Sequence, residues 1–202
     1  MMDGLAARQL SSIAGLSRAG VEATMAGENP TGDWYRGSYD ALRHAGTELF
    51  CYVPDAGIDP VIRMAHADNS VRAVVMTTEE EGVGICCGAW LGGMRAVLMI
   101  QSSGVGNCVN AFTLARNARV PLLTLVSMRG EWGEGNRWQI PMGRATEEVM
   151  KLAGFTVYRA TVPDEAVRLI EGAATMAYQS EQQVAVLLSQ RLVGAKVFED
   201  NE

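Results

Sequence analysis

Six short runs of apolar residues constrain this chain more than any other feature of its sequence. They lie at residues 49–53, 73–76, 96–100, 122–127, 155–158 and 184–189, and none of them alternates with polar residues. Strands buried on both faces have this pattern, and such strands belong to parallel sheets covered by helices. The runs therefore predict six strands of one α/β domain.

The segments between the runs have helical spacing. Pro163 suits a first helical position, and Asp164 and Glu165 suit the positive end of the helix dipole. Apolar residues then recur along one stripe, at Ala166, Ile170, Ala173, Ala174 and Ala177. Another helix is predicted to begin at Thr146 and to end at Gly154. Because helical segments separate the six runs, we expect a doubly wound six-stranded parallel sheet with helices on both faces.

Residues 1–35 differ from the rest of the chain. They are rich in Ala, Gly and Ser and contain no long apolar core, which excludes a secretory signal. We expect an N-terminal arm here, followed by one domain at residues 36–202. A transit peptide is the alternative, although Asp3 and Glu22 do not fit its acid-poor composition.

Charge and cysteine content exclude several classes of protein. Lys and Arg number 17 against 23 Asp and Glu, a formal net charge of −6, and no basic stripe suited to nucleic acid is present. No apolar run reaches the roughly 20 residues of a membrane helix. The four cysteines form neither a disulfide framework nor a zinc motif. We expect reduced thiols in the core of a cytoplasmic protein.

Function in this architecture belongs to the carboxyl ends of the strands. The first such loop, residues 77–82, holds three consecutive glutamates. An acidic helix start is one interpretation, because the helix dipole favours it. The other is catalytic: Glu80 shares a helical face with Val83, Gly84 and Cys87. A carboxyl on such an apolar face must find a donor or carry a raised pKa, the usual condition of an acid–base catalyst.

The second loop, residues 101–107, contains two glycines at alternate positions. Gly104 and Gly106 allow close approach of the backbone to a ligand, and Asn107 is expected to open a helix. The loop does not match a dinucleotide fingerprint, because Val109 occupies the place of the third glycine. A tight strand-to-helix turn is the alternative.

The third loop, residues 128–143, is long enough to be a functional lid. Trp132 and Trp138 argue against disorder, and Arg129, Arg137 and Arg144 suit an anionic substrate or a partner surface. Ordinary surface charge is the alternative. Elsewhere, His44 and His66 have no matching base or nucleophile nearby, and we expect both to be structural or exposed.

Together the three loops resemble the pyrimidine-binding domain of thiamine-diphosphate enzymes, in particular sulfopyruvate and phosphonopyruvate decarboxylases. The resemblance rests on residues 80–85, 101–110 and 127–131 and extends over residues 48–190. In that family one glutamate begins the helix after the second strand. Counting back ten residues from Trp90, which replaces the family's tyrosine, gives Glu80.

The resemblance implies a role for each of these residues. The carboxyl of Glu80 would bond the pyrimidine N1′ of thiamine diphosphate and favour the imino tautomer that generates the cofactor's carbanion. Glu80 is thus the expected catalytic residue, and it would bind the cofactor together with Ser103, Gly104, Gly106 and Asn107.

Family members bind magnesium and the diphosphate through a Gly-Asp-Gly motif, which this chain lacks. The resemblance therefore implies a split enzyme in which a beta subunit carries the magnesium and diphosphate site. The cofactor would be shared between the chains of a heterotetramer or larger complex. Apolar surface around Leu91 and around residues 110–114 would be covered by that partner.

The implied substrate is a small anionic 2-oxoacid, first of all sulfopyruvate, which would give sulfoacetaldehyde and CO₂. Arg129 and Gln139 follow the subgroup, but Ile140 replaces a histidine that suits a phosphonate. Arg137 and Arg144 would then bind the sulfonate. Phosphonopyruvate decarboxylase, another carboligase or lyase subunit with this cofactor, and a non-catalytic binding module of the same fold are the alternatives.

Overall fold

The computed structural model describes residues 34–195. The predicted N-terminal arm, residues 1–35, lies outside the described residues except for Trp34 and Tyr35. These two residues are buried in the first turn of helix α3 (Trp34–His44).

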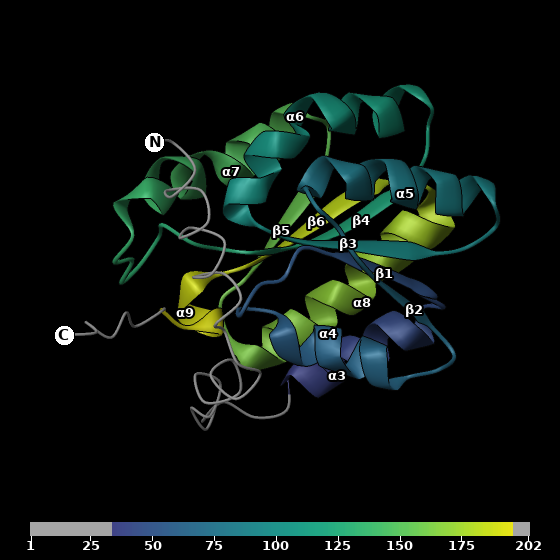
Figure 1. Ribbon diagram of the computed structural model, residues 1–202, viewed down its shortest axis with the longest axis horizontal. Helices are drawn as coiled ribbons and strands as arrows, with labels where there is room; N and C mark the ends of the chain where they lie inside the picture. The colour runs from purple at the N-terminus through teal and green to yellow at the C-terminus, as the bar shows by residue number, and fades with distance from the viewer. Residues whose placement is uncertain (1–33, 196–202) are drawn as a thin grey trace, which may run out of the picture. The chain divides into compact units, whose positions relative to one another are not determined.

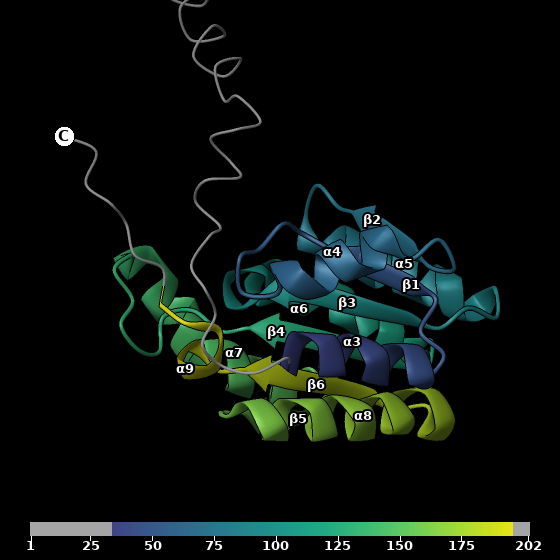
Figure 2. The ribbon, with the colours of Figure 1, turned by 90° about the horizontal axis from the view of Figure 1, so that it is seen from below.

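Within the described residues, six strands form one sheet in which every neighbouring pair is parallel. The order across the sheet is β2-β1-β3-β4-β6-β5 (Figure 2). The strands are β1 (Leu49–Tyr52), β2 (Arg72–Val75), β3 (Ala96–Gln101), β4 (Leu122–Ser127), β5 (Thr156–Ala160) and β6 (Gln183–Leu188). All six predicted strands are thus confirmed.

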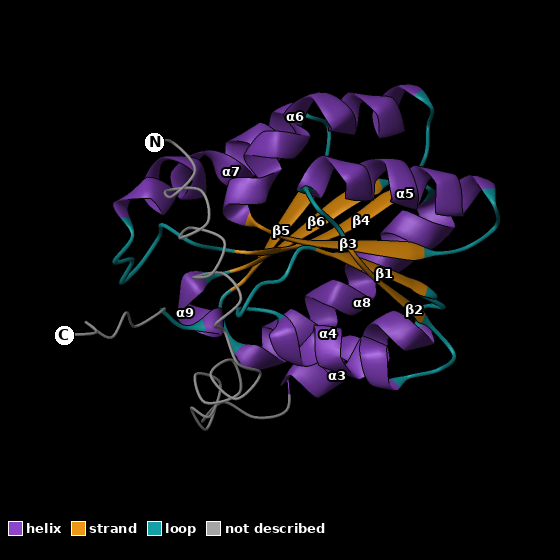
Figure 3. Cartoon of the chain, viewed as in Figure 1, coloured by secondary structure: helices purple, strands orange, loops and turns teal. Residues whose placement is uncertain are grey.

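Helices cover both faces of the sheet, as predicted (Figures 1 and 3). One face carries α3, α4 (Asp59–Ala67) and α8 (Pro163–Ser180). The other carries α5 (Glu79–Leu91), α6 (Ser102–Asn117) and α7 (Ile140–Leu152). Two short helices, η1 (Arg137–Gln139) and α9 (Gln190–Val193), lie near the carboxyl ends of the strands.

Each face of the sheet has its own apolar core. The predicted stripe of α8, from Ala166 to Ala177, is fully buried in one of them. Strands β1, β3, β4 and β6 are buried along almost their whole length, whereas β2 and β5 are partly exposed. The expectation of burial on both faces therefore fails for β2 and β5, because edge strands have a neighbour on one side only.

Two predicted helix starts are wrong. Helix α7 begins at Ile140, with Pro141 in its first turn, and the hydroxyl of Thr146 lies inside the helix and donates to the Met142 carbonyl (2.7 Å). Its predicted end is confirmed, because Gly154 follows the helix with φ +98°. Helix α6 begins at Ser102, so Asn107 lies in its second turn. Both predicted loops, 101–107 and 128–143, are consequently shorter than the sequence indicated.

A close backbone contact joins the end of β4 to the start of α7. An added Cβ on Gly143 would lie 1.9 Å from the carbonyl oxygen of Arg129, and one on Gly130 would lie 2.4 Å from the carbonyl oxygen of Gln139. Gly130 also has φ +78°, in the left-handed region. Glycine is therefore required at both positions for this turn to pack against α7.

The substitution Gly143→Ala tests this contact. Its methyl group has no space, so we expect the free energy of unfolding to fall by about 1–3 kcal/mol or more in urea denaturation. Gly172→Ala in α8 is the matched control, because nothing lies within 4 Å of its added Cβ. The control should gain about 0.5–1 kcal/mol. Equal stability of the two variants would show that the contact is not tight.

Candidate active site

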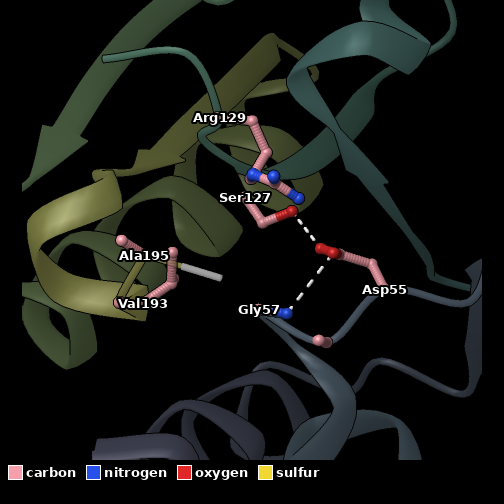
Figure 4. Close-up of a pocket in the computed structure, with 8 residues that line it drawn as sticks. Asp55, Gly57, Ser127, Arg129, Val193 and Ala195 are labelled. Carbon is pink, nitrogen blue, oxygen red and sulfur yellow. Dashed lines mark hydrogen bonds between the residues drawn. The ribbon is translucent and has the colours of Figure 1, made fainter. Parts of the chain in front are cut away.

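A cavity lies at the carboxyl end of the sheet, where the direction of strand order reverses. From β1 the chain moves outward to β2 and then returns to β3 on the other side of β1. Ligands of doubly wound proteins bind at this crevice. The cavity has a volume of about 160 Å³ (Figure 4), and it is lined by Asp55, Ala56, Gly57, Ser127, Arg129, Val193, Gly194 and Ala195.

Asp55 is the most connected polar side chain in the cavity wall. Its Oδ1 accepts hydrogen bonds from Gln101 Nε2 (3.0 Å) and from the backbone N–H of Gly57 (3.3 Å). Its Oδ2 accepts a hydrogen bond from the hydroxyl of Ser127 (Figure 4). The sequence analysis missed Asp55. The available signal was an aspartate that directly follows Pro54, just beyond a buried strand.

Of the predicted substrate-binding residues, Arg129 lines the cavity. Its Nε and Nη2 both donate to the carboxylate of Glu134 at 2.6 Å. The side chains are 12% and 3% exposed, so the pair is withdrawn from solvent. Hydrogen bonds from Arg129, supported by the backbone N–H of Asn136 and the side chain of Gln190, lower the pKa of Glu134 to about 2.

A buried glutamine extends this pair into a network. Gln190 Nε2 donates to Glu134 (3.0 Å), and Gln190 Oε1 accepts from the backbone N–H groups of Glu131 and Trp132 (2.9 and 3.0 Å). Glu131 in turn pairs with Arg159 at the end of β5. The segment after β4 is thereby fixed to α9 and β5.

The other predicted substrate-binding residues do not line the cavity. Arg137 and Arg144 are exposed on η1 and α7. The Oε1 of Gln139 is buried without a hydrogen-bond partner. Of the expected lid, residues 128–143, Arg129 lines the cavity, whereas Trp132 and Trp138 do not and are 52% and 83% exposed. Glu134 and Gln190 fix the backbone after β4, and the side chains of Trp132 and Trp138 face solvent.

The three glutamates form the first turn of α5, but their side chains have different hydrogen-bond partners and different exposure. Glu79 Oε2 accepts a hydrogen bond from Asn107 Nδ2 (2.7 Å). Its side chain occupies the space of a Cβ on Gly104, which would lie 2.4 Å from Glu79 Cγ. Glu81 accepts from the backbone N–H of Thr77 (2.8 Å). Glu80 is exposed.

The apolar face expected around Glu80 is thus only partly present. Val83 and Cys87 are buried, but Gly84 is exposed like Glu80 itself. The phase of α5 decides this, since its buried side packs against β3 and α6 and takes Glu79 inward. Glu79 is therefore the half-buried member of the three glutamates and the one in contact with α6.

The predicted cofactor-binding residues all lie in the first two turns of α6, where they contact neighbouring segments of the chain. Gly104 makes room for Glu79, and a Cβ on Gly106 would lie 3.2 Å from Met142 Sδ. The Ser103 hydroxyl donates to Gln101 Oε1 (3.1 Å). None of the four, Asn107 included, is among the residues that line the cavity around Asp55.

The cysteines and histidines agree with the sequence analysis. All four cysteines are free and buried. Burial, with the carboxylates of Glu79 and Glu80 nearby, raises the pKa of the Cys108 thiol to about 12, so it is not a nucleophile. His44 and His66 are exposed, and His66 Nε2 bonds the Tyr52 hydroxyl (2.6 Å).

Residues 34–195 contain no group of three or more His, Cys, Asp and Glu arranged to hold a metal ion. Over the same residues no helix is long and apolar enough to cross a membrane.

Comparison with known proteins identifies the family. The sulfopyruvate decarboxylase subunit alpha of Methanococcus maripaludis is 35% identical over 151 residues, which cover 74% of this chain and 90% of that protein. The chain belongs to the family of sulfopyruvate decarboxylase alpha subunits. A sulfopyruvate decarboxylase of Methanosarcina acetivorans is 29% identical over 154 residues, 76% of this chain and 39% of that protein. No family model matches the chain.

The fold has a solved counterpart. A 2-oxoglutarate:ferredoxin oxidoreductase from Magnetococcus marinus superposes with a TM-score of 0.66 at 14% identity, over 79% of this chain and 29% of that protein. At this identity the likeness shows the α/β fold of the alpha subunit.

The Arg129–Glu134 pair is expected to make the free energy of unfolding depend on pH in the acid range. The pKa of Glu134 in the folded chain, about 2, lies below its ordinary 4.5. Its stabilisation is therefore present above about pH 4.5 and is lost as the pH falls toward 2. Glu134→Gln should lower stability at pH 7 and make the loss between pH 4.5 and 2 shallower, measured as the unfolding midpoint against pH. Parallel profiles for the two proteins would contradict this role.

Proposed function

We propose that this chain is the pyrimidine-side subunit of a thiamine-diphosphate-dependent decarboxylase that converts sulfopyruvate to sulfoacetaldehyde and CO₂. The observation that carries the proposal is the 35% identity to a sulfopyruvate decarboxylase subunit alpha, over 90% of that protein. The cavity at the carboxyl edge of the sheet supports it, because a few polar side chains, Asp55, Ser127 and Arg129, line it at the place where ligands of this fold bind.

The residues at the start of α5 and α6 fit the pyrimidine side of the cofactor. When bound, thiamine diphosphate supplies a carbanion that adds to a carbonyl carbon and accepts the electrons left by the departing carboxylate. This chain would provide the carboxyl that bonds the pyrimidine. Asn107 and Gly104 would hold that carboxyl in place, since Asn107 bonds Glu79 and Gly104 makes room for it, and Ser103 and Gly106 are proposed to contact the cofactor itself.

We assign this role to Glu79 rather than to Glu80. A carboxyl that favours one tautomer of a ring has to be fixed in direction, and Glu79 is held by Asn107 at 2.7 Å. Glu80 faces outward on the side of α5 that carries Gly84 and Gly88, around which an added Cβ meets nothing within 4 Å. That side suits contact with a partner chain.

A series of glutamine variants in the assembled enzyme separates the three glutamates. Glu79→Gln keeps the size of the side chain but removes its proton transfer, so we expect turnover to fall by about 10²-fold or more. Glu80→Gln and Glu81→Gln are the matched controls and should lose less. A larger loss for Glu80→Gln would restore the assignment made from the sequence.

A beta subunit is proposed to bind magnesium and the diphosphate, because the chain has no Gly-Asp-Gly motif. The outer side of α5 and α6 suits its docking. Leu91, Val109 and Leu114 are exposed there, and the two helices carry no charged residue between Gly82 and Leu91 or between Ser102 and Leu114. Exposed apolar surface of this kind marks a contact between proteins.

The assembled complex is proposed to be at least a heterotetramer and to reside in the cytoplasm, in agreement with four free thiols. Within this complex, Arg129 is proposed to bind the sulfonate group of the substrate. Glu134 occupies its Nε and Nη2, and Nη1 has no hydrogen bond to residues 34–195. The exposed Arg137 and Arg144 are proposed to contact the beta subunit instead of the substrate.

Reconstitution tests the function. The chain is co-expressed with a candidate beta subunit, a chain that carries Gly-Asp-Gly, and CO₂ release is measured with sulfopyruvate, phosphonopyruvate and pyruvate. We expect kcat/KM for sulfopyruvate to exceed that for pyruvate by about 10- to 100-fold, the effect of one hydrogen bond to a charged group. The single chain should be inactive. Equal use of sulfopyruvate and pyruvate, or turnover by the single chain, would contradict the proposal.

A further inference from the structure

Glu134 controls the charge that Arg129 presents to the cavity. It accepts hydrogen bonds from Nε and Nη2 of Arg129, each of 2.6 Å, and it is not itself among the residues that line the cavity. The backbone N–H groups of Gly130 and Asn136 and the side chain of Gln190 also donate to its carboxylate (3.2, 2.9 and 3.0 Å). Glu134 cannot leave Arg129 without unpairing these donors.

Arg129 consequently offers hydrogen bonds without a net charge. Its Nη1 has no hydrogen bond to residues 34–195, so it can donate to an oxyanion. The carboxylate of Glu134 cancels the charge of the guanidinium, because these bonds lower its pKa to about 2 and keep it ionised at neutral pH. Asp55, on the same cavity wall, adds a second carboxylate. The described wall therefore has no excess positive charge.

The charged groups packed around this pair do not alter the balance. Arg159 on β5 pairs with Glu131 and Glu147, and Glu147 also pairs with Lys151 on α7. The other cations on the neighbouring elements are exposed and do not line the cavity: Arg137, Arg144 and Arg191. The second negative charge of a ligand at Arg129 would thus meet carboxylates without a matching cation from the described residues.

The two acid groups that a small 2-oxoacid could present here differ in charge. A sulfonate has one negative charge at any pH at which proteins are folded. Phosphate monoesters lose their second proton at about pH 6, and phosphonates lose theirs somewhat above this. A phosphonate is therefore mainly a dianion at about pH 8.5. Repulsion of the wrong ligand is a common source of specificity, and like charges brought together weaken binding strongly.

We propose that Glu134 determines the charge selectivity of this site: it cancels the charge of Arg129, so the cavity accepts an acid group with one negative charge and rejects the phosphonate dianion. This inference rests on the proposed function, which places the sulfonate at Arg129. Glu134 acts through Arg129 and has no contact of its own with the ligand.

Binding of two unreactive acids to the reconstituted complex tests the proposal. 3-Sulfopropionate and 3-phosphonopropionate have the carbon chain of the substrates without the reactive carbonyl. Calorimetry at about pH 6 and about pH 8.5 should show an affinity for 3-sulfopropionate that stays within about 2-fold. The affinity for 3-phosphonopropionate should fall by about 10-fold over the same range, as its second proton is lost.

Variants then assign this selectivity to Glu134. Glu134→Gln keeps the size of the side chain and an acceptor for Arg129 but removes the charge. The preference for 3-sulfopropionate at about pH 8.5 should therefore fall by about 10-fold. Glu134→Asp retains the charge and should retain the preference. Glu147→Gln is the matched control, because it removes the same charge from a side chain that pairs with Arg159 and Lys151.

The double variant Arg129→Gln with Glu134→Gln gives the test if Glu134→Gln does not fold. It removes both charges together, so binding of both acids should weaken while the preference for 3-sulfopropionate at about pH 8.5 remains. Loss of that preference in the folded double variant would overturn the inference. An unchanged preference in folded Glu134→Gln would overturn it as well, and so would an equal effect of Glu147→Gln.

The outcomes separate this inference from the proposed function. If the unmodified complex releases no CO₂ from sulfopyruvate, the proposed function is wrong, while the binding of the two acids still decides the role of Glu134. If sulfopyruvate is decarboxylated but 3-phosphonopropionate binds equally well at both pH values, the function stands and the charge selectivity is wrong. Failure of the unmodified complex to bind either acid would also overturn the inference.

Discussion

The contact between Ser102 and Arg129 holds the candidate site together. The Ser102 hydroxyl accepts the backbone N–H of Arg129 at 3.0 Å, and the Thr146 hydroxyl reaches the Ser102 carbonyl at 3.3 Å. The start of α6, the end of β4 and the middle of α7 are thereby joined at one buried point. Backbone N–H and C=O groups that are removed from water need hydrogen-bond partners, and these two bonds fix how α6, β4 and α7 meet.

Two glycines allow the junction to close. Gly143 brings α7 onto the carbonyl of Arg129, and Gly130 turns the chain away from it. The turn then directs Arg129 into the cavity, where Glu134 fixes its guanidinium. A buried ion pair of this kind contributes geometric definition more than stability, since its desolvation offsets much of its attraction.

The site has two parts that face different surroundings. Around Asp55 the polar groups satisfy one another inside the chain, with three donors on one carboxylate. Around Glu79 the printed contact is the hydrogen bond from Asn107 between α5 and α6, two helices on which Leu91 and Leu114 are exposed. The hydrogen bonds of the first part are complete within this chain. The exposed apolar side chains near the second part are of the kind that marks a contact between proteins.

The sequence by itself determined the six strands, the buried stripe of α8 and the family, because these depend on local periodicity and on motifs of consecutive residues. The tertiary structure decided which side chains meet. Asp55 reaches Gln101 and Ser127 across 46 and 72 residues of sequence, which only the register of parallel strands brings about. The phase of α5 turned Glu79 inward and Glu80 outward, a difference of one position that packing against α6 fixes and that composition does not.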